Sequence, residues 1–111
     1  MRAFHCLVLL TSASMGAQGN ITRIALVNSN IPSGAILRAI DENCQNVVLT
    51  NDVSKASYTL EAQINRESEN HVERSWLTLF DKNGDAIFTT ETRGTGNAVK
   101  DVCNFLKLGK R

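Results

Sequence analysis

The sequence predicts an α+β domain, built as a two-layer sandwich. We expect a mixed sheet of about five strands with two helices on one face, in the order β-α-β-β-β-β-α. Two segments, 33–44 and 98–108, carry apolar residues at every third or fourth position, as amphipathic helices do. Five short segments are β-branched or alternate between apolar and polar residues. A length of 111 residues with one proline fits a single small domain.

The first half of the chain predicts a β-α-β unit. Segment 21–27 is short, β-branched and, except for Thr22 and Arg23, apolar on both faces, which is typical of a central strand covered on both sides. Pro32 suits the first turn of a helix. In the helix over 33–44, Ile36, Ile40 and Cys44 recur at every fourth position and form one apolar stripe. Asn46 ends that helix, and a short strand follows over 47–50.

The second half predicts an antiparallel meander closed by a helix. Segment 58–65 alternates cleanly and predicts a half-buried strand. Segment 66–73 is polar and predicts a loop, and 74–80 and 86–92 predict the two arms of a hairpin. Gly94-Thr95-Gly96 ends the last strand, and Asn97 is expected to cap the final helix over 98–108. Cys103 lies on the apolar stripe of that helix.

Asp81-Lys82-Asn83-Gly84-Asp85 is compatible with either a calcium loop or a hairpin turn. Oxygen-bearing side chains occur at positions one, three and five of an EF-hand pattern, but the glycine and the final glutamate of that pattern are missing. The flanking segments are strand-like rather than helical. Asn-Gly between two such segments is the strongest short-range signal for a hairpin with a two-residue loop. We therefore expect a hairpin and no metal site.

A two-residue loop would fix the pairing of the two arms. Leu79 would lie opposite Phe88, and Phe80 opposite Ile87. Trp76, Phe80 and Ile87 would then share one face of the sheet. Two interpretations stay open: these residues form an exposed patch that contacts a partner, or segment 66–73 covers them.

The N-terminus has the features of a secretory signal peptide. Arg2 is followed by a short apolar stretch, and Ala17-Gln18-Gly19 is a small-x-small cleavage site. We expect a signal peptide over 1–19, cleavage near Gly19 and a single mature domain over 20–111. The protein would be exported, either periplasmic or secreted. The apolar stretch is shorter than the about 20 residues of a permanent membrane span, so no span is expected after cleavage.

The cysteines predict a disulfide. Cleavage would remove Cys6 and leave Cys44 and Cys103. An even count in an exported domain suggests a bond between them. The alternative is a pair of buried free thiols.

One further segment could bind a small molecule. Glycines precede a helix N-terminus, where anions bind readily, and the candidate anion site comprises Arg93, Gly94, Gly96, Asn97 and Lys100. The alternative is an ordinary entry into a helix. His71 lacks a second ligand at metal-binding spacing. A net charge of +1 gives no electrostatic case for nucleic acid.

Two stretches resemble a family of small, exported, uncharacterised bacterial proteins. They are SKASYTLEAQ (54–63) and LTLFDKNGDAIFTTETRGTGNAVKDVCNFL (77–106), which are similar to an S-K-A-D-Y strand entry and a GNAVKDaC ending. This chain has Ser57 where the family tends to have aspartate. The order of elements is also similar to that of the N-terminal domain of TolB and related periplasmic modules. The resemblance implies an α/β fold and an envelope location but supplies no catalytic residue.

These observations favour an exported, non-enzymatic α/β domain that needs no cofactor. It would act as an interaction module for an unknown protein partner in the envelope or extracellular space, through the Trp76 face or the free edge of the meander. The alternative is a small anionic-ligand binder or hydrolase that uses Arg93 and the segment from Gly94 to Lys100.

Overall fold

The computed structural model describes residues 21–67 and 72–108. The expected signal peptide, Asn20 and His71 lie outside these residues. The elements in chain order are β1 (Thr22–Val27), α2 (Ser33–Asn43), β2 (Val47–Thr50), the 3-10 turn η1 (Val53–Lys55), β3 (Tyr58–Glu67), β4 (Val72–Phe80), β5 (Ala86–Thr92) and α3 (Thr95–Leu108). The predicted α+β class and the predicted order of strands and helices are confirmed.

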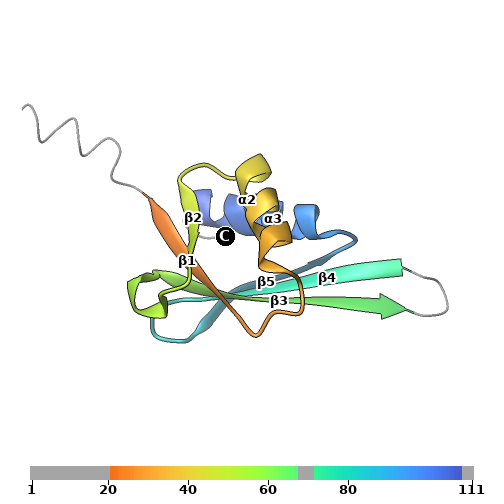
Figure 1. Cartoon of the computed structure of the whole chain (residues 1–111), viewed down its shortest axis with the longest axis horizontal. Coiled ribbons are helices and arrows are strands. Elements are labelled where there is room, and N and C mark those ends of the chain that lie inside the picture. Colours follow the sequence, from red (N-terminus) through yellow and green to blue (C-terminus); the bar gives the residue numbers. More distant parts are fainter. Residues whose placement is uncertain (1–20, 68–71, 109–111) are drawn as a thin grey trace, which may run out of the picture.

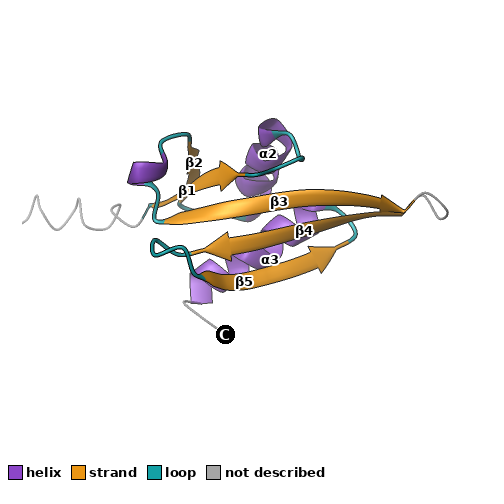
Figure 2. Cartoon of the chain, turned by 90° about the horizontal axis from the view of Figure 1, so that it is seen from below, coloured by secondary structure: helices purple, strands orange, loops and turns teal. Residues whose placement is uncertain are grey.

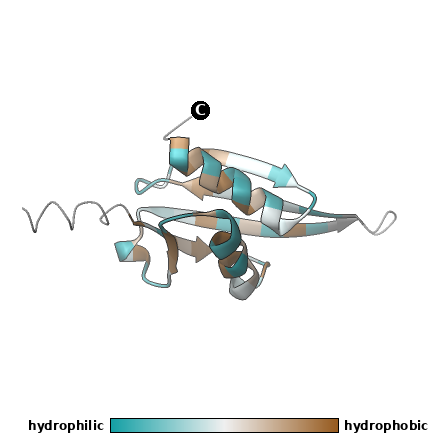
Figure 3. Ribbon diagram, turned by 90° about the horizontal axis from the view of Figure 1, so that it is seen from above, coloured by the Kyte–Doolittle hydropathy of each residue, from teal (hydrophilic) through white to brown (hydrophobic). Residues whose placement is uncertain are grey.

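The five strands form one mixed sheet in the spatial order β2-β1-β3-β4-β5. β1 is parallel to both β2 and β3, whereas β3, β4 and β5 form the predicted antiparallel meander. Both helices lie on the same side of this sheet (Figure 1). In Figure 3, α3 lies over the β4–β5 side and α2 over the other side. The structure is therefore a two-layer sandwich with one uncovered sheet face.

The helices and the inner face of the sheet enclose one apolar core. The stripe of α2 contributes Ile36, Ala39 and Ile40, and these side chains meet the fully buried Leu77 and Leu79 of β4 in the core cluster. α3 contributes Ala98, Val99, Val102, Cys103 and Phe105. Phe105 stacks on Phe88 of β5 with ring centroids 4.7 Å apart. The predicted apolar stripes are thus the surfaces that bind the helices to the sheet.

The connection from β2 to β3 explains why β1 is apolar on both faces. β1 lies between these two strands, so segment 51–57 must pass across it. The Ser57 N–H donates to the Arg23 carbonyl at 2.9 Å. Ala25 is 1% exposed and Ala56 3% exposed, although neither belongs to the core cluster beneath the helices. The crossing segment therefore covers the outer side of β1 at Ala25, whereas Arg23 and its paired residue Val48 of β2 stay exposed. The largest open part of that face lies over β3, β4 and β5.

A disulfide joins the two helices. Cys44 directly follows α2, Cys103 lies within α3, and their Cα atoms are 5.5 Å apart. This bond confirms the predicted pairing and closes a loop with a sequence separation of 59 residues. It ties the helices to each other on the side of the sheet that they already cover.

The predicted hairpin is present, but its loop differs from the predicted one. The Asp81 N–H donates to the Asp85 carbonyl at 2.9 Å, and the Gly84 N–H donates to the Asp81 carbonyl at 3.0 Å. Gly84 has φ +87°, whereas Asn83 has no positive φ. A type I turn followed by a left-handed glycine makes a three-residue loop over 82–84. The two-residue Asn-Gly loop was the wrong prediction.

The longer loop changes the pairing of the arms beyond it. Leu79 lies opposite Phe88, as predicted, but Phe80 lies opposite Ala86 instead of Ile87. A β-bulge between these pairs absorbs the difference, with Ile87 as the extra residue. Because of the bulge, the Phe88 side chain still points into the core, although the turn is one residue longer than predicted.

Two predicted boundaries were also wrong. Segment 66–73 is mostly strand, because Arg66 pairs with Glu73 and Glu67 with Val72. A two-stranded ladder satisfies its backbone groups whatever the polarity of the side chains, so a polar sequence did not exclude it. α3 begins at Thr95, with Asn97 inside its first turn instead of at its cap. The Ala98 N–H accordingly donates to the Gly94 carbonyl at 3.3 Å.

Removing the disulfide should lower stability substantially. The double variant Cys44→Ala with Cys103→Ala should lose about 4 kcal/mol of unfolding free energy, because an open chain of this length gains entropy when it unfolds. Urea unfolding of the variant against the oxidised full chain measures the loss. The wild-type chain treated with a reductant is the control and should approach the variant. A variant as stable as the oxidised chain would show that the bond adds nothing.

Two glycine substitutions should have opposite effects. Gly84→Ala should cost about 1–2 kcal/mol, because φ is +87° there and a Cβ is strained in that region. Gly96→Ala should stabilise by about 0.5–1 kcal/mol, since this glycine lies in α3 and an added Cβ meets no atom within 4 Å. Thermal unfolding compares the two. Equal effects of both substitutions would argue against the three-residue loop.

Candidate interaction surface

The sheet face opposite the helices is uncovered over β3, β4 and β5 (Figure 2). Side chains alternate along β4, and Leu77 and Leu79 point into the core with no exposed surface. Trp76, Thr78 and Phe80 therefore point to the opposite face. We call the outward side chains of β3, β4 and β5 the open face.

Trp76 is the largest apolar side chain on the open face. It lies on the middle strand of the meander, opposite Gln63 of β3 and Glu91 of β5. Its side chain is 40% exposed. Large aromatic residues bury much area at little entropic cost and often dominate binding energy. Trp76 is thus the side chain of this face best suited to bind another molecule.

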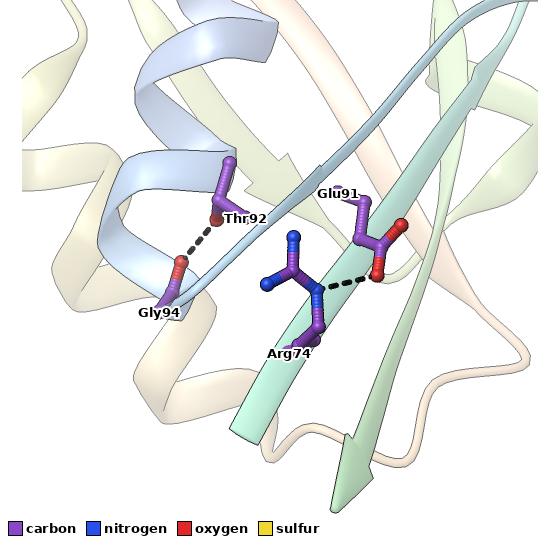
Figure 4. A network of polar contacts seen from close by, with 4 residues as sticks. All are labelled: Arg74, Glu91, Thr92 and Gly94. Atoms are coloured by element: carbon purple, nitrogen blue, oxygen red, sulfur yellow. Dashed lines mark hydrogen bonds and ion pairs between the residues drawn. The ribbon is translucent and has the colours of Figure 1, made fainter. Parts of the chain in front are cut away.

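Polar side chains flank Trp76 toward the start of β4. The Arg74 Nε donates to the Glu91 Oε2 at 2.6 Å (Figure 4). Both side chains are more than one-third exposed, and an exposed pair of this kind adds little stability. The pair does hold the Glu91 carboxylate beside β4. A partner that covers Trp76 would therefore meet an ordered charged pair at the rim.

Phe80 and Ile87 continue the apolar part of the open face toward the hairpin turn. Ile87 is 37% exposed and Phe80 is partly buried. The bulge places Ile87 beside Phe80 without the direct pairing predicted from the sequence. Residues 66, 67, 72 and 73, which belonged to the alternative covering loop, are part of β3 and β4 themselves.

Amide side chains form hydrogen bonds along the border between the open face and β1. The Asn28 Nδ2 donates to the Glu61 Oε2 at 3.3 Å, and the Gln63 Nε2 donates to the Asn28 carbonyl. Asn28 has φ +48°, which asparagine tolerates better than most residues. In the sequence, segment 28–30 lies between the expected strand over 21–27 and the expected helix over 33–44 and carries no pattern of its own. Its partners lie more than thirty residues away, so no local pattern could have revealed them.

Asn30 acts as a short substitute for a neighbouring strand. Its N–H donates to the Ala62 carbonyl at 3.0 Å. Its side-chain oxygen accepts from the Ile64 N–H at 2.7 Å, and its Nδ2 donates to the Ile64 carbonyl at 3.3 Å. A carboxamide has the same donor and acceptor arrangement as a peptide group. The Ala62 carbonyl and the backbone groups of Ile64, beyond the last pair with β1, are thereby hydrogen-bonded.

The hairpin turn uses its own acidic side chain. The Asp81 Oδ1 accepts from the Asn83 N–H at 2.9 Å and from the Asp85 N–H at 3.0 Å. Lys82 reaches across the sheet end and donates to the Ala56 carbonyl at 2.8 Å. Within residues 21–67 and 72–108, no group of three or more metal-ligating side chains is found. The Asp81 carboxylate therefore orders the turn, and Lys82 ties it to the crossing segment.

The candidate anion site lies at the N-terminus of α3, on the helix side of the molecule. Arg93, Gly96, Asn97 and Lys100 are exposed and Gly94 is half-buried. The Thr92 hydroxyl donates to the Gly94 carbonyl at 2.6 Å (Figure 4), which fixes the entry into the helix. Neither glycine has a positive φ, and an added Cβ would meet no atom within 4 Å at either position. Helix entry accounts for the conformation of this segment.

Comparisons with protein-family models, curated proteins and solved structures find no match to this chain. The resemblance to the exported bacterial family and to TolB-like modules therefore stays a prediction. Across the described residues, no helix combines the length and the apolar character needed to cross a membrane.

Adjacent residues of β4 should differ sharply in their contribution to stability. Leu77→Ala should cost about 2–5 kcal/mol, because it leaves a cavity in the core. Trp76→Ala should cost about 1 kcal/mol or less, since it removes mainly cross-strand contacts on an exposed face. Urea unfolding of both variants measures the difference. A loss at Trp76 as large as that at Leu77 would show that the open face is covered.

Proposed function

We propose that the protein is an exported, non-enzymatic α/β domain that binds a protein partner through its open face. The observation that carries this proposal is the 40% exposure of Trp76 on a sheet face over which the described part of the chain places no helix. A soluble domain usually covers a face that carries large aromatic residues, and one left uncovered marks a contact surface. Trp76, Phe80 and Ile87 are the proposed contact residues.

The composition of the open face suits a transient, non-obligate complex with a protein partner. Thr78 and Thr89 lie between Trp76 and the apolar residues Phe80 and Ile87, and the Arg74–Glu91 pair lies next to Trp76. Non-obligate interfaces mix apolar and polar side chains, because as a whole they are only about as apolar as the rest of a protein surface. The Thr78 and Thr89 hydroxyls lie 3.2 Å apart and can exchange that bond for one to a partner.

The disulfide supports the proposed location. Disulfides persist in oxidising compartments and are rare in the cytosol. The bond between Cys44 and Cys103 is therefore consistent with export, as is the signal-like sequence over 1–19. The partner would then be a periplasmic, envelope or extracellular protein. The rival anion-binding function would use the opposite, helix-bearing side of the molecule.

Affinity capture tests the open face directly. The tagged protein, exposed to periplasm or culture supernatant, should retain a partner that the double variant Trp76→Ser with Phe80→Ser fails to retain. Leu37→Ser is the matched control, because Leu37 is 45% exposed but lies on α2, away from the open face. Capture by the control variant should equal that of the wild type. Retention of the same partner by the double variant would overturn the proposal.

A further inference from the structure

The two edge strands of the sheet, β2 and β5, differ in length and in how far they are protected from pairing with another strand. β2, at one edge, is only 4 residues long, and the projecting part of β3 is bonded to Asn30. β5, at the other edge, runs for 7 residues without proline or lysine. Edge strands are ordinarily protected by shortness, proline, lysine, a β-bulge or a covering segment. The bulge of β5 lies at Ile87, next to the hairpin turn, so residues 88–92 remain a regular edge without these protections.

We propose that β5 pairs antiparallel with β5 of a second copy of this chain, around a two-fold axis at Thr89. In this register Thr89 faces its own equivalent and Phe88 faces Thr90 of the second copy, both within the regular part of β5 beyond the bulge. No like charges meet, and threonine pairs are favourable across strands. The pairing goes beyond the proposed function, because it uses the edge of the sheet and leaves the open face free.

The helix layer identifies a second copy as the occupant. α3 packs against both β4 and β5, so its axis lies about half a strand spacing inside the edge. Adding a strand spacing of about 4.8 Å places two α3 helices about 10 Å apart, which is a normal helix-packing distance. An isolated peptide strand would leave the flank of α3 uncovered. A second copy brings a strand and a helix at the required spacing.

The flank of α3 beyond β5 is hollow and partly apolar. A cavity of about 370 Å³ lies between this helix and the edge strand. Its lining includes Phe88, Thr90, Asp101, Phe105 and Leu108. Leu108 is 71% exposed. The second copy of α3 would cover this hollow and bury Leu108, which adds apolar area to the backbone pairing.

In the proposed dimer, polar side chains on the α3 flank of one copy lie next to side chains of the second copy with which they can form hydrogen bonds. The Thr90 hydroxyl donates to the Asp101 Oδ2 at 2.7 Å, and Phe105 stacks on Phe88. Because Thr89 lies between Phe88 and Thr90 on β5, its position along the strand corresponds to the part of α3 between Asp101 and Phe105. In the antiparallel helix pair, Asn104 of each copy then lies about 1.5 Å along the axis from Asp101 of the other. An amide donor next to a carboxylate forms a charge-assisted hydrogen bond. The two-fold axis produces this bond twice.

Sedimentation equilibrium of the full chain tests the pairing. The cysteine outside the disulfide is replaced by Cys6→Ser, so that no unrelated disulfide forms. The wild-type surface should give a reversible dimer. Asn104→Asp places carboxylates against Asp101 of the other copy and should weaken the dimer by about tenfold or more. The matched control Asn51→Asp changes the same charge near the opposite edge and should leave the dimer unchanged.

A variant with the two residues exchanged shows whether Asn104→Asp weakens the dimer by breaking the contact with Asp101 or by destabilising the fold of each copy. Asp101→Asn combined with Asn104→Asp restores an amide opposite a carboxylate and should recover the dimer. A wild-type chain that stays monomeric at millimolar concentration would overturn the proposal, and so would an Asn104→Asp dimer as tight as the wild type. Far-ultraviolet circular dichroism confirms that each variant is folded.

Chemical cross-linking tests the register independently. Thr89→Cys in the Cys6→Ser background should cross-link to its equivalent with a short bis-maleimide, because directly opposed residues have Cβ atoms about 5 Å apart. Asn51→Cys should give no dimer band. A Thr89→Cys chain that dimerises in solution but does not cross-link would exclude this register. Failure of the dimer and failure of partner capture are separate outcomes, since Trp76 takes no part in the pairing.

Discussion

One-sided coverage of the sheet is the constraint on which the other features depend. α2 and α3 both pack on the same face and are joined by the Cys44–Cys103 bond. A sheet of five strands presents two faces, and two short helices can cover only one of them. The second face is covered only where segment 51–57 crosses β1. The exposure of Trp76 and Ile87 is a consequence of this architecture, because the chain has no further helix in its described part to place over them.

The same constraint divides the surface into parts with different roles. The helix side carries the disulfide and the N-terminus of α3, where Thr92 and Gly94 define the helix entry. The open face carries aromatic and threonine side chains on a hydrogen-bonded ladder with one bulge, at Ile87. Rigid strands hold contact residues in place more accurately than loops do. A binding function on the open face would therefore need no rearrangement of the fold.

The sequence predicted the features that repeat and missed those that join distant segments. The stripe that includes Ile36 and Ile40 marked α2, and the alternation around Leu60 and Ala62 marked β3, because burial imposes a period on each. The hairpin at Gly84 was predicted, but its three-residue loop was not. The choice between two and three loop residues depends on the bulge at Ile87, which keeps Phe88 inward against Phe105. The bonds of Asn30 to Ile64 and of Lys82 to Ala56 have no local signal at all. Parity predicted that Trp76 lies on the face opposite Leu77 and Leu79, but it left open whether that face is exposed, because exposure depends on where segment 66–73 lies.

Hydroxyl-radical footprinting is the measurement that tests one-sided coverage most directly. Trp76, on the open face, should be oxidised rapidly in the free protein, whereas Phe105, on the buried side of α3 and only 8% exposed, should be protected. After correction for the intrinsic reactivity of each side chain, the account predicts a large difference between these two residues in the free chain. Protection of Trp76 comparable to that of Phe105 would contradict it, because some part of the protein would then have to cover the face that is described as open.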